Sequence, residues 1–405
     1  MCPSSPVALP NSLPIVEQAK IAPMQDHPTS MDAVVIVGGG FGGLTAALNL
    51  SRQQPRWPVI LIEPKDRFLF QPLLYELLSD ELQAWEVAPK YDQLLSHYGI
   101  NWLRDRVTAI DTNAKTVATE SGETIHWHQL LIASGSKPHD FGIPGVREHA
   151  LGFQTFNDVN RLRQRIRELQ QMRNDHSALV IVGAGPTGVE LACKLTDLLE
   201  GRARLHLVEM GESILPNSAA FNRERAEAAL EQRGVTVHLQ TAVTAVQPTE
   251  VEFNDGRRLE HQGLLWTAGS RPQLPAIHPS PTLSKGRLAI DSKLNLVDRP
   301  DVFVIGDAAR CDQEDWPSTA QVAMQQGQSV AISLQAAHQG SEGQPFQFED
   351  RGEMLSLGLG DATLTGMGLT LAGPLAFQIR RATYLTRLPG LSLGLRSAGA
   401  WLLGR

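Results

Sequence analysis

Two parts of the chain repeat one order of apolar and polar positions. The first reads DAVVIVGGGFGGLTAALNLSR from residue 32, and the second reads ALVIVGAGPTGVELACKL from residue 178. In each, a short apolar run that ends in glycine predicts a buried strand, and the periodic apolar positions that follow predict a helix. A further apolar run ending in an acid comes after each helix, VILIE at 59–63 and RLHLVE at 204–209. Strands that alternate with helices predict an α/β fold with parallel sheets.

The glycines between strand and helix have the spacing GxGxxG in both parts. They are Gly38, Gly40 and Gly43 in the first part, and Gly183, Gly185 and Gly188 in the second. In dinucleotide-binding folds the first glycine permits a tight turn, the second lets the backbone approach a pyrophosphate, and the third lets the helix pack on the strand. The helix N-terminus then stabilises the phosphates. The sequence therefore predicts two Rossmann-like dinucleotide-binding domains, one for FAD and one for NADH or NADPH, with electrons passing between the two nucleotides.

The acids that end the second apolar runs are Glu63 and Glu209. Both are placed to accept hydrogen bonds from ribose hydroxyls. Glu209 favours NADH, because the 2′-phosphate of NADPH would meet a like charge. Arg202 or Arg204 could offset that charge, so both nicotinamide cofactors stay open.

Three further apolar runs indicate which of the two glycine loops binds FAD. Residues 130–138 (LLIASGSKP) and 264–272 (LLWTAGSRP) suit strands that return from a nucleotide domain. Their small residues nearest a cofactor are Ala133, Gly135 and Gly269. The run DVFVIGDAAR places Gly306 and Asp307 after a buried strand, a pair that meets the flavin ribityl chain in flavoproteins with two dinucleotides. This assigns FAD to the first glycine loop, whereas the alternative is a simple N-cap of the next helix by Asp307.

Composition narrows the class of protein. A chain of 405 residues with 42% apolar and 20% charged residues suits two or three folded domains, and its net charge of -7 argues against nucleic acid as a partner. Three cysteines without a CxxC motif exclude a disulfide scaffold and a dithiol centre. His126 and His128 belong to an alternating strand pattern with no further ligand cluster, so no metal site is expected.

The two ends of the chain differ from its middle. Residues 1–30 hold six prolines and no apolar periodicity, which predicts a flexible extension without a signal peptide. No window of 18 unbroken apolar residues occurs, so no transmembrane helix is expected. The predicted division is 1–30 as extension, 31–147 and 269–345 as the FAD-binding domain, 148–268 as the NAD(P)H-binding domain, and 346–405 as a membrane-association segment.

An apolar helix predicted after Thr319 carries three glutamines on neighbouring turns. Gln321 and Gln325 share one face because they are four residues apart, and Gln326 follows them. A polar stripe on an apolar helix faces solvent or binds a polar group.

These glutamines belong to the run AQVAMQQ at 320–326, which has the form AQxAxQQ. With this motif and the two glycine loops, the sequence resembles the type II NAD(P)H:quinone oxidoreductases, single-subunit, non-pumping flavoproteins of respiratory and photosynthetic membranes. The resemblance runs from about Asp32 to the C-terminus. RFLFQPLLYELLSDELQAWEVAPKY, RGEMLSLGLGDA and GLTLAGPLAFQIRRATYLTRLPG are most similar to the cyanobacterial and plastid branch, which includes demethylphylloquinone reductases.

The resemblance implies a partner, a location and residue roles. The partner is a membrane quinone, a prenylated naphthoquinone or plastoquinone, and the protein is peripheral on the cytoplasmic side of a thylakoid or plasma membrane if it is cyanobacterial. Gln321, Gln325 and Gln326 would lie by the flavin and the quinone headgroup, where amides donate hydrogen bonds without changing charge. Glu190 matches the family glutamate that handles protons or binds substrate. The alternative for Glu190 is an acid stabilised by the helix macrodipole.

The C-terminal segment offers a route to a lipid-soluble quinone. From Leu371 to Arg405 there are five arginines and no acid. An apolar face is predicted at helical spacing by Leu375, Ile379, Ala382, Leu385 and Leu388. Arg380 and Arg387 would form a basic margin, Pro389 and Gly390 would end the helix, and a second segment carries Trp401. This composition predicts an in-plane membrane anchor on the lipid surface. The alternative is a helix packed on its own domain or on the partner of a homodimer.

Three other functions share the two-loop plan. The first is a soluble flavin reductase of another acceptor, and the second is an FAD- and NAD(H)-binding redox sensor similar to apoptosis-inducing factor. The third, a sulfide:quinone oxidoreductase, needs a redox cysteine pair near the flavin. Cys311 follows GDAAR, but Cys193 belongs to the predicted nicotinamide domain, which disfavours such a pair.

Overall fold

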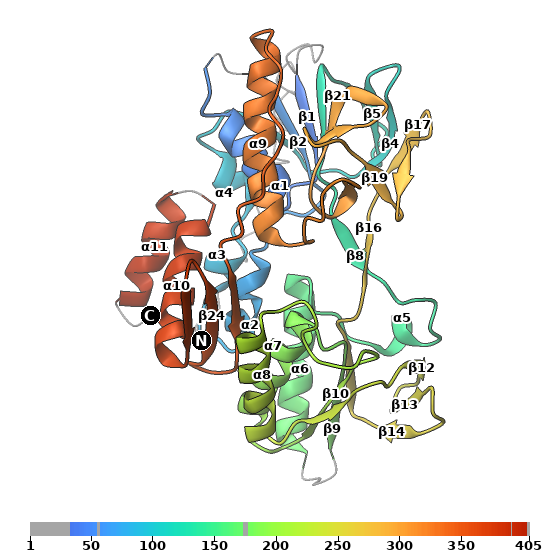
Figure 1. The fold of residues 1–405 in the computed structure, drawn as a ribbon, viewed down its shortest axis with the longest axis vertical. Helices are drawn as coiled ribbons and strands as arrows, with labels where there is room; N and C mark the ends of the chain where they lie inside the picture. Colours follow the sequence, from blue (N-terminus) through green and yellow to red (C-terminus); the bar gives the residue numbers. More distant parts are fainter. Residues whose placement is uncertain (1–32, 55–56, 173–176, 390, 403–405) are drawn as a thin grey trace, which may run out of the picture.

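The computed structural model describes residues 33–54, 57–172, 177–389 and 391–402. The predicted N-terminal extension at 1–30 lies outside these residues. Figure 1 shows three units: one at the top with β1 and α9, a second at the bottom with β9 and α8, and a third with α10 and α11 beside their junction.

The first unit contains a six-stranded sheet with the order β20-β21-β7-β1-β2-β3. These strands span Asn295–Leu296 (β20), Arg299–Val304 (β21), Gln129–Ile132 (β7), Val34–Val37 (β1), Val59–Ile62 (β2) and Ile100–Leu103 (β3). All neighbours are parallel except β20, which is antiparallel to β21. All four residues of β1 are buried, as expected of a central parallel strand. Because β21 follows the second unit in the sequence and joins the sheet of the first, the second unit interrupts the first.

Helices α1 (Phe41–Leu50) and α9 (Ala320–His338) pack side by side in this unit (Figure 1). Two glycines permit the close approach. A Cβ on Gly327 would lie only 2.4 Å from the carbonyl oxygen of Gly42. The helix that carries the glutamines is therefore fixed directly against the helix that follows the first glycine loop.

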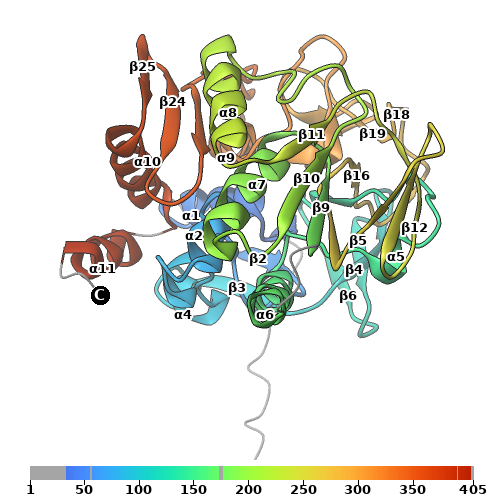
Figure 2. The same cartoon turned by 90° about the horizontal axis from the view of Figure 1, so that it is seen from below.

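The second unit contains a four-stranded parallel sheet with the order β11-β10-β9-β15. Its strands and helices are Thr236–His238 (β11), Arg204–Val208 (β10), Ala178–Val182 (β9), Gly263–Trp266 (β15), Phe156–Gln171 (α6), Pro186–Leu199 (α7) and Ala220–Gln232 (α8). Val180, Val182 and Trp266 pack against Val251 and Phe253 of a small antiparallel sheet. Figure 2 shows α7 and α8 on the other side of the parallel sheet, so this unit has three layers.

The two connections between these units form an antiparallel ribbon. Strand β8 (Ser136–Pro138) leads from the first unit to the second, and β16 (Ser270–Pro272) leads back. Lys137 lies opposite Arg271 in this ribbon. The two Ser-basic-Pro segments of the sequence are therefore paired crossing strands. The predicted domain limits at 147 and 268 stay predictions.

The remaining elements of these two units are short. They are Gln71–Leu73 (η2), Leu74–Leu78 (α2), Ala84–Val87 (α3), Tyr91–Leu95 (α4), Val107–Asp111 (β4), Thr116–Thr119 (β5), Thr124–His126 (β6), Val146–His149 (α5), Val243–Val246 (β12), Glu250–Phe253 (β13), Arg258–Glu260 (β14), Ala276–His278 (β17), Leu283–Ser284 (β18), Arg287–Ala289 (β19), Gly306–Ala308 (η3) and Ala309–Arg310 (β22).

The third unit is an antiparallel sheet followed by two helices. The elements are Glu353–Ser356 (β23), Ala362–Gly366 (β24), Leu369–Ala372 (β25), Pro374–Arg387 (α10) and Leu391–Leu402 (α11). The sequence predicts the helix now seen as α10 and a second segment after it, but not the sheet, because each strand has only four or five residues between glycine-rich turns. Figure 2 shows α10 beside β24 and β25, with α11 at the edge of the molecule. Among the described helices, none has the length and apolarity needed to cross a bilayer.

Helix α10 has two distinct faces, and one prediction about them is wrong. Leu375 and Ala382 of the predicted apolar face are exposed. Arg380 does not lie at an exposed basic margin. It belongs to the inward row Ala376, Arg380 and Tyr384, whose spacing of four residues turns all three side chains toward the protein interior, and it is fully buried.

Helix α11 packs on α3 of the first unit, and each helix contributes one tryptophan to the contact, Trp401 from α11 and Trp85 from α3. Trp401 donates a hydrogen bond from Nε1 to Glu86 Oε1 at 2.8 Å, and the guanidinium carbon of Arg381 lies 4.3 Å from the Trp401 ring centre. The guanidinium carbon of Arg396 lies 4.2 Å from the ring centre of Trp85. This side of the C-terminal segment therefore packs on its own chain, which is the alternative stated above for that segment.

Candidate active site

The first glycine loop is tightly packed at two of its three motif glycines and open at the third. Gly38 has a φ of +101°, and a Cβ there would lie 2.4 Å from the carbonyl oxygen of Ala133. A Cβ on Gly43 would lie 1.9 Å from the carbonyl oxygen of Gly38. A Cβ on Gly40, in contrast, would meet no atom within 4 Å. Two glycines therefore serve packing, and Gly40 leaves open space beside the N-terminus of α1, where a pyrophosphate fits.

The second glycine loop repeats this geometry. Gly183 has a φ of +100°, and a Cβ on Gly188 would lie 1.8 Å from its carbonyl oxygen. A Cβ on Gly185 would again meet no atom within 4 Å. Gly269, at the return strand, has a φ of +69° and faces the ring of Phe141. The two loops predicted from sequence thus have one backbone design and one open position each.

The two acids hold the glycine loops in matching ways. Glu63 accepts hydrogen bonds from the backbone N–H groups of Gly39 at 2.8 Å and Lys65 at 3.0 Å. Glu209 accepts from those of Ala184 at 2.8 Å and Gly211 at 2.8 Å. Each carboxylate oxygen accepts one N–H in this way, so each keeps a further lone pair for a ribose hydroxyl.

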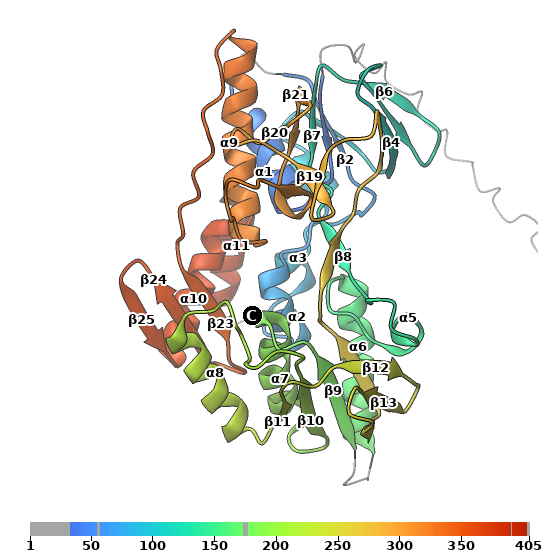
Figure 3. The same cartoon turned by 45° about the vertical axis from the view of Figure 1, so that its right-hand side comes forward.

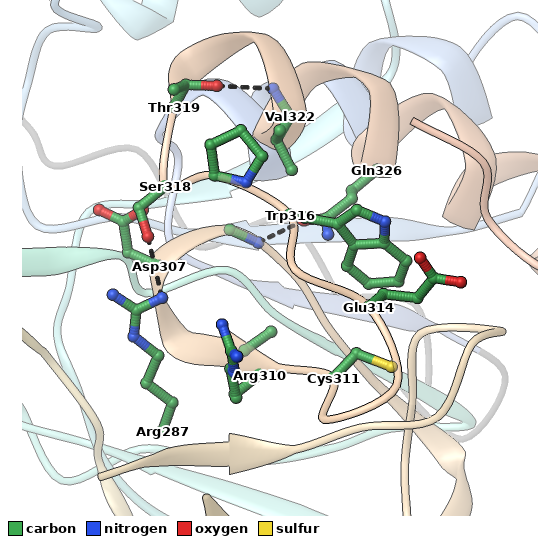
Figure 4. Close-up of a pocket in the computed structure, with 13 residues that line it drawn as sticks. Arg287, Asp307, Arg310, Cys311, Glu314, Trp316, Ser318, Thr319, Val322 and Gln326 are labelled. Carbon is green, nitrogen blue, oxygen red and sulfur yellow. Dashed lines mark hydrogen bonds between the residues drawn. The ribbon is translucent and has the colours of Figure 1, made fainter. Parts of the chain in front are cut away.

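Asp307 is placed by the end of the sheet and by the return strand. It lies in η3, and its Oδ2 accepts a hydrogen bond from Ser136 Oγ at 2.6 Å, next to Gly135. The N-cap of the next long helix, α9, is Thr319, whose side chain accepts from Val322 N. Asp307 is therefore not the cap of that helix. Figure 4 shows it at a pocket that also includes Arg310, Cys311 and Gln326.

The three glutamines of α9 face two different partners. Gln326 is buried, and its Oε1 accepts from the backbone N–H of Gly306 at 2.7 Å (Figure 4). Gln325 forms two hydrogen bonds with the backbone of Glu349, at 2.8 Å and 3.0 Å. Gln321 Nε2 lies 3.4 Å from Asp350 Oδ1 on the same face. Gln321 and Gln325 therefore hold the segment that leads to the third unit, while Gln326 contacts the Gly-Asp turn.

Glu190 lies where the three units meet. Its Oε1 accepts a hydrogen bond from the backbone N–H of Ser356, in β23, at 2.7 Å. Burial raises the pKa of Glu190 to about 7, against the opposing effects of Arg380, the Ser356 hydrogen bond and Tyr75. Figure 3 shows α2, α7, β23 and α10 gathered at this junction. A carboxyl group with a pKa near 7 can take up and release a proton at neutral pH.

The sequence does not point to the side chains that surround Glu190. Tyr75 and Glu76 come from α2, and Arg380 and Tyr384 come from α10. All four are buried. The available signal is local: an arginine occupies the apolar row of α10, and an acid stands among the leucines of α2. Neither signal names the partner, because more than three hundred residues separate them in the chain.

A cavity of about 660 Å³ opens between the first and third units. Its lining comes largely from α1, α9, α10 and α11 and is mixed. The apolar part includes Phe41, Leu44, Phe68, Met324, Leu388 and Leu395, and the basic part consists of Arg52, Arg351 and Arg387. Met324 precedes Gln325 on α9, which connects the cavity to the glutamine helix. The volume is within the range of about 300–1,000 Å³ typical of small-molecule sites.

The cysteines of the described residues carry no redox pair. Cys193 and Cys311 are both buried and free. Burial raises the pKa of Cys193 to about 12, so its thiol is not a nucleophile at neutral pH.

Comparison with known proteins first gives the class. The family model for pyridine nucleotide-disulphide oxidoreductases matches residues 32–327. Because that match spans well over half of the chain and contains both glycine loops, the protein belongs to this family of oxidoreductases.

Individual relatives give the narrower family. The chain is 36% identical to demethylphylloquinone reductase of Synechocystis sp., over 91% of this chain and 97% of the relative. It is 30% identical to a type II NADH:quinone oxidoreductase of Mycobacterium tuberculosis, over 94% and 90%. The solved NDH2 of Plasmodium falciparum in complex with NADH has a TM-score of 0.81, 17% identity, and coverage of 90% and 96%, which shows a shared fold.

The chain thus belongs to the type II NAD(P)H:quinone oxidoreductases. It is an oxidoreductase that uses FAD and a nicotinamide cofactor. The predicted family, enzyme class and cofactors are confirmed.

Proposed function

We propose that this enzyme reduces a prenylated naphthoquinone in a membrane, with demethylphylloquinone as the favoured candidate and plastoquinone as the alternative. The observation that carries the proposal is the cavity between the glutamine helix and the C-terminal helices, which has both apolar and polar walls. The tail of a prenyl quinone needs apolar walls to reach an active site from a bilayer, and Phe41, Leu44 and Leu388 are among those that line this cavity. The name of the Synechocystis relative supports the naphthoquinone headgroup.

The two nucleotides would occupy the two glycine loops. FAD would be held by Gly38, Gly40, Gly43, Glu63, Ala133, Gly135, Gly306 and Asp307, and the nicotinamide cofactor by Gly183, Gly185, Gly188, Glu209 and Gly269. When bound, FAD would supply the redox chemistry, a hydride taken from the nicotinamide and two electrons passed to the quinone. The open positions at Gly40 and Gly185 support both assignments.

The protein side chains would manage protons and position the headgroup. Formation of a quinol consumes protons, and Glu190 would supply one because its pKa is close to neutral. Gln326 would hold the Gly-Asp turn in place through its bond to Gly306. Gln325 and Gln321 would fix the segment at 349–350 that borders the quinone route.

Membrane association would use one apolar edge of the third unit. Met367 is 87% exposed at the β24–β25 turn, Leu369 is 57% exposed and Leu375 is 62% exposed. Exposed apolar side chains on neighbouring elements favour insertion into the lipid interface. Arg387 of α10 adds positive charge that suits anionic lipid headgroups.

A triple variant tests this edge. Met367→Glu, Leu369→Glu and Leu375→Glu together should lower binding to vesicles with anionic lipids by tenfold or more, because each buried apolar side chain contributes about 1.5–3 kcal/mol. Vesicle co-sedimentation measures the effect. Ile332→Glu is the matched control, since Ile332 is 65% exposed on α9, outside the third unit. Equal binding by the triple variant and the control would refute the assignment of this edge.

The nicotinamide preference follows from the position of Glu209. Arg204 begins β10 and Glu209 follows its last residue, so about five residues of extended strand, roughly 16 Å, separate them. That backbone distance exceeds the Debye length of about 8 Å at physiological salt, so Arg204, and Arg202 before it in the sequence, should offset the charge of Glu209 only weakly. We therefore expect NADH to be preferred. Glu209→Ala should raise kcat/KM for NADPH relative to NADH by about tenfold or more. An unchanged ratio would remove Glu209 from the selectivity.

The quinone itself is tested by comparing substrates. Purified, FAD-loaded enzyme would be assayed with NADH and a demethylated naphthoquinone, its methylated counterpart and a plastoquinone analogue. The proposal expects the highest kcat/KM for the demethylated naphthoquinone. A clear preference for plastoquinone would establish the alternative instead.

A further inference from the structure

Glu190 shares its buried site with a second acid and an arginine that the reaction scheme has not used. Arg380 and Glu76 are both completely buried and form a hydrogen-bonded ion pair. Arg380 Nη2 also donates to the backbone carbonyl of Pro72 at 2.7 Å. The same Nη2 lies 3.8 Å from Glu190 Oε1. One arginine therefore faces two carboxyl groups in a buried site.

The elements around Glu190 carry few other charges. Helix α2 supplies Glu76 and the hydroxyl of Tyr75, and α10 supplies Arg380 and the hydroxyl of Tyr384. Strand β23 supplies the backbone N–H of Ser356. Burial raises the pKa of both tyrosines, so both are neutral near pH 7. On α7 itself, Lys194 lies one turn beyond Glu190, is fully buried and pairs with Glu81 at 2.6 Å, and the thiol of Cys193 is neutral.

The charge balance of the cluster depends on the proton of Glu190. With Glu190 protonated, Arg380 and Glu76 cancel and the site is neutral. With Glu190 ionised, one negative charge is buried without full compensation, which costs free energy in a low dielectric. If Glu76 were absent, Arg380 would instead pair with Glu190 and hold it as a carboxylate.

We propose that Glu76 and Arg380 are positioning residues for the reaction, in which Glu76 neutralises Arg380 and so leaves Glu190 free to take up and release a proton. The inference rests on the proton-handling role of Glu190 in the proposed function. It adds that the two buried acids have different roles: Glu76 pairs with Arg380, and Glu190 takes up and releases the proton.

The proposal predicts opposite effects from two conservative changes. Glu76→Gln should lower the pKa of Glu190 by about 1 unit or more, because Arg380 then has one acid left to pair with. The double variant Glu76→Gln/Arg380→Gln should raise it above that of the wild type, because the guanidinium that lies 3.8 Å from Glu190 is gone and Lys194 stays paired with Glu81. A purely structural role would change stability in both variants without moving this pKa in opposite directions.

The test is an infrared titration of the FAD-loaded enzyme. The carbonyl stretch of a protonated carboxylic acid is followed against pH, and the band that Glu190→Gln removes belongs to Glu190. Since both test variants lack Glu76, Glu190 is the buried acid of the cluster that remains to titrate. At pH 7 we expect this band to be lost in Glu76→Gln and to persist in the double variant.

Two controls separate charge from packing. Arg163→Gln removes an arginine that also binds α2, through the carbonyl of Leu77 and the side chain of Asp80. It should leave the Glu190 titration unchanged. Arg380→Lys keeps the charge and should keep a near-native titration, which provides a second route if the other variants fold poorly.

The outcomes are distinct from those of the proposed function. Opposite shifts in the two variants support the inference whatever quinone is reduced. Equal titrations in wild type, Glu76→Gln and the double variant would overturn it, even in an enzyme that reduces naphthoquinones rapidly. In kinetics, Glu76→Gln should lower kcat for quinone reduction and leave KM for NADH unchanged, whereas a shift of KM alone would contradict the positioning role.

Discussion

Glu190→Gln is expected to slow quinone reduction by about 10²–10⁴-fold, the range that one general acid contributes. The wild-type rate of flavin reoxidation by quinone should fall as pH rises through about 7, because the protonated form of Glu190 is the donor. In Glu190→Gln this dependence should disappear, since glutamine does not titrate. Rapid mixing of the reduced enzyme with quinone at several pH values measures both effects.

The titration of Glu190 should also change how the free energy of unfolding depends on pH. The pKa of Glu190 is raised from 4.5 to about 7 by folding, so the unfolded state loses this proton first as pH rises. The free energy of unfolding contributed by this group is therefore fully present below about pH 4.5 and is lost as pH approaches 7. In Glu190→Gln, the free energy of unfolding should lack this part of its pH dependence.

If the rate of flavin reoxidation in Glu190→Gln keeps the pH dependence of the wild type, Glu190 is not the proton donor.

Gly40→Val is expected to lower FAD affinity by about 100-fold or more while the protein still folds. A Cβ at Gly40 meets no protein atom within 4 Å, so the fold should accept the new side chain, which then takes the space expected for the pyrophosphate. Each hydrogen bond from the loop to the charged pyrophosphate that is lost costs about 1.5–3 kcal/mol. Absorbance of bound flavin and circular dichroism measure binding and folding separately.

Gly185→Val provides the internal comparison. It should retain FAD and lose reduction by NADH, because its open position belongs to the second loop. Gly399→Val is the matched control, since a Cβ there also meets nothing within 4 Å but lies on α11. If Gly40→Val lost NADH binding and kept FAD, the assignment of the two loops would have to be exchanged.

The glycine loops could be predicted because their geometry is local. Gly43 and Gly188 each pack on the carbonyl oxygen of the glycine five residues earlier, and that earlier glycine, Gly38 or Gly183, has a positive φ, so the spacing in the sequence carries this part of the structure. Glu63 is similarly close to its loop, because parallel pairing of β1 with β2 aligns the two strand ends. The alternation of strands and helices was enough for the fold class.

The rest of the site depends on contacts between distant segments. The pairing of Arg380 with Glu76 joins α10 to α2, and an amphipathic pattern alone assigns such an arginine to the surface. The AQxAxQQ motif also does not predict the hydrogen bonds of Gln325 to Glu349, because it identifies the glutamine and not its partner. The small β23–β25 sheet has strands too short to show a clear period.

The central claim is that electrons pass from a nicotinamide through FAD to a quinone. Anaerobic stopped-flow with sequential mixing tests it most directly: the FAD-loaded enzyme is reduced with NADH and then mixed with a demethylated naphthoquinone. The account predicts fast bleaching of the flavin absorbance, followed by full reoxidation at a rate no slower than turnover. Bleaching by NADH without reoxidation by any quinone would contradict it and favour another acceptor or a redox-sensing role.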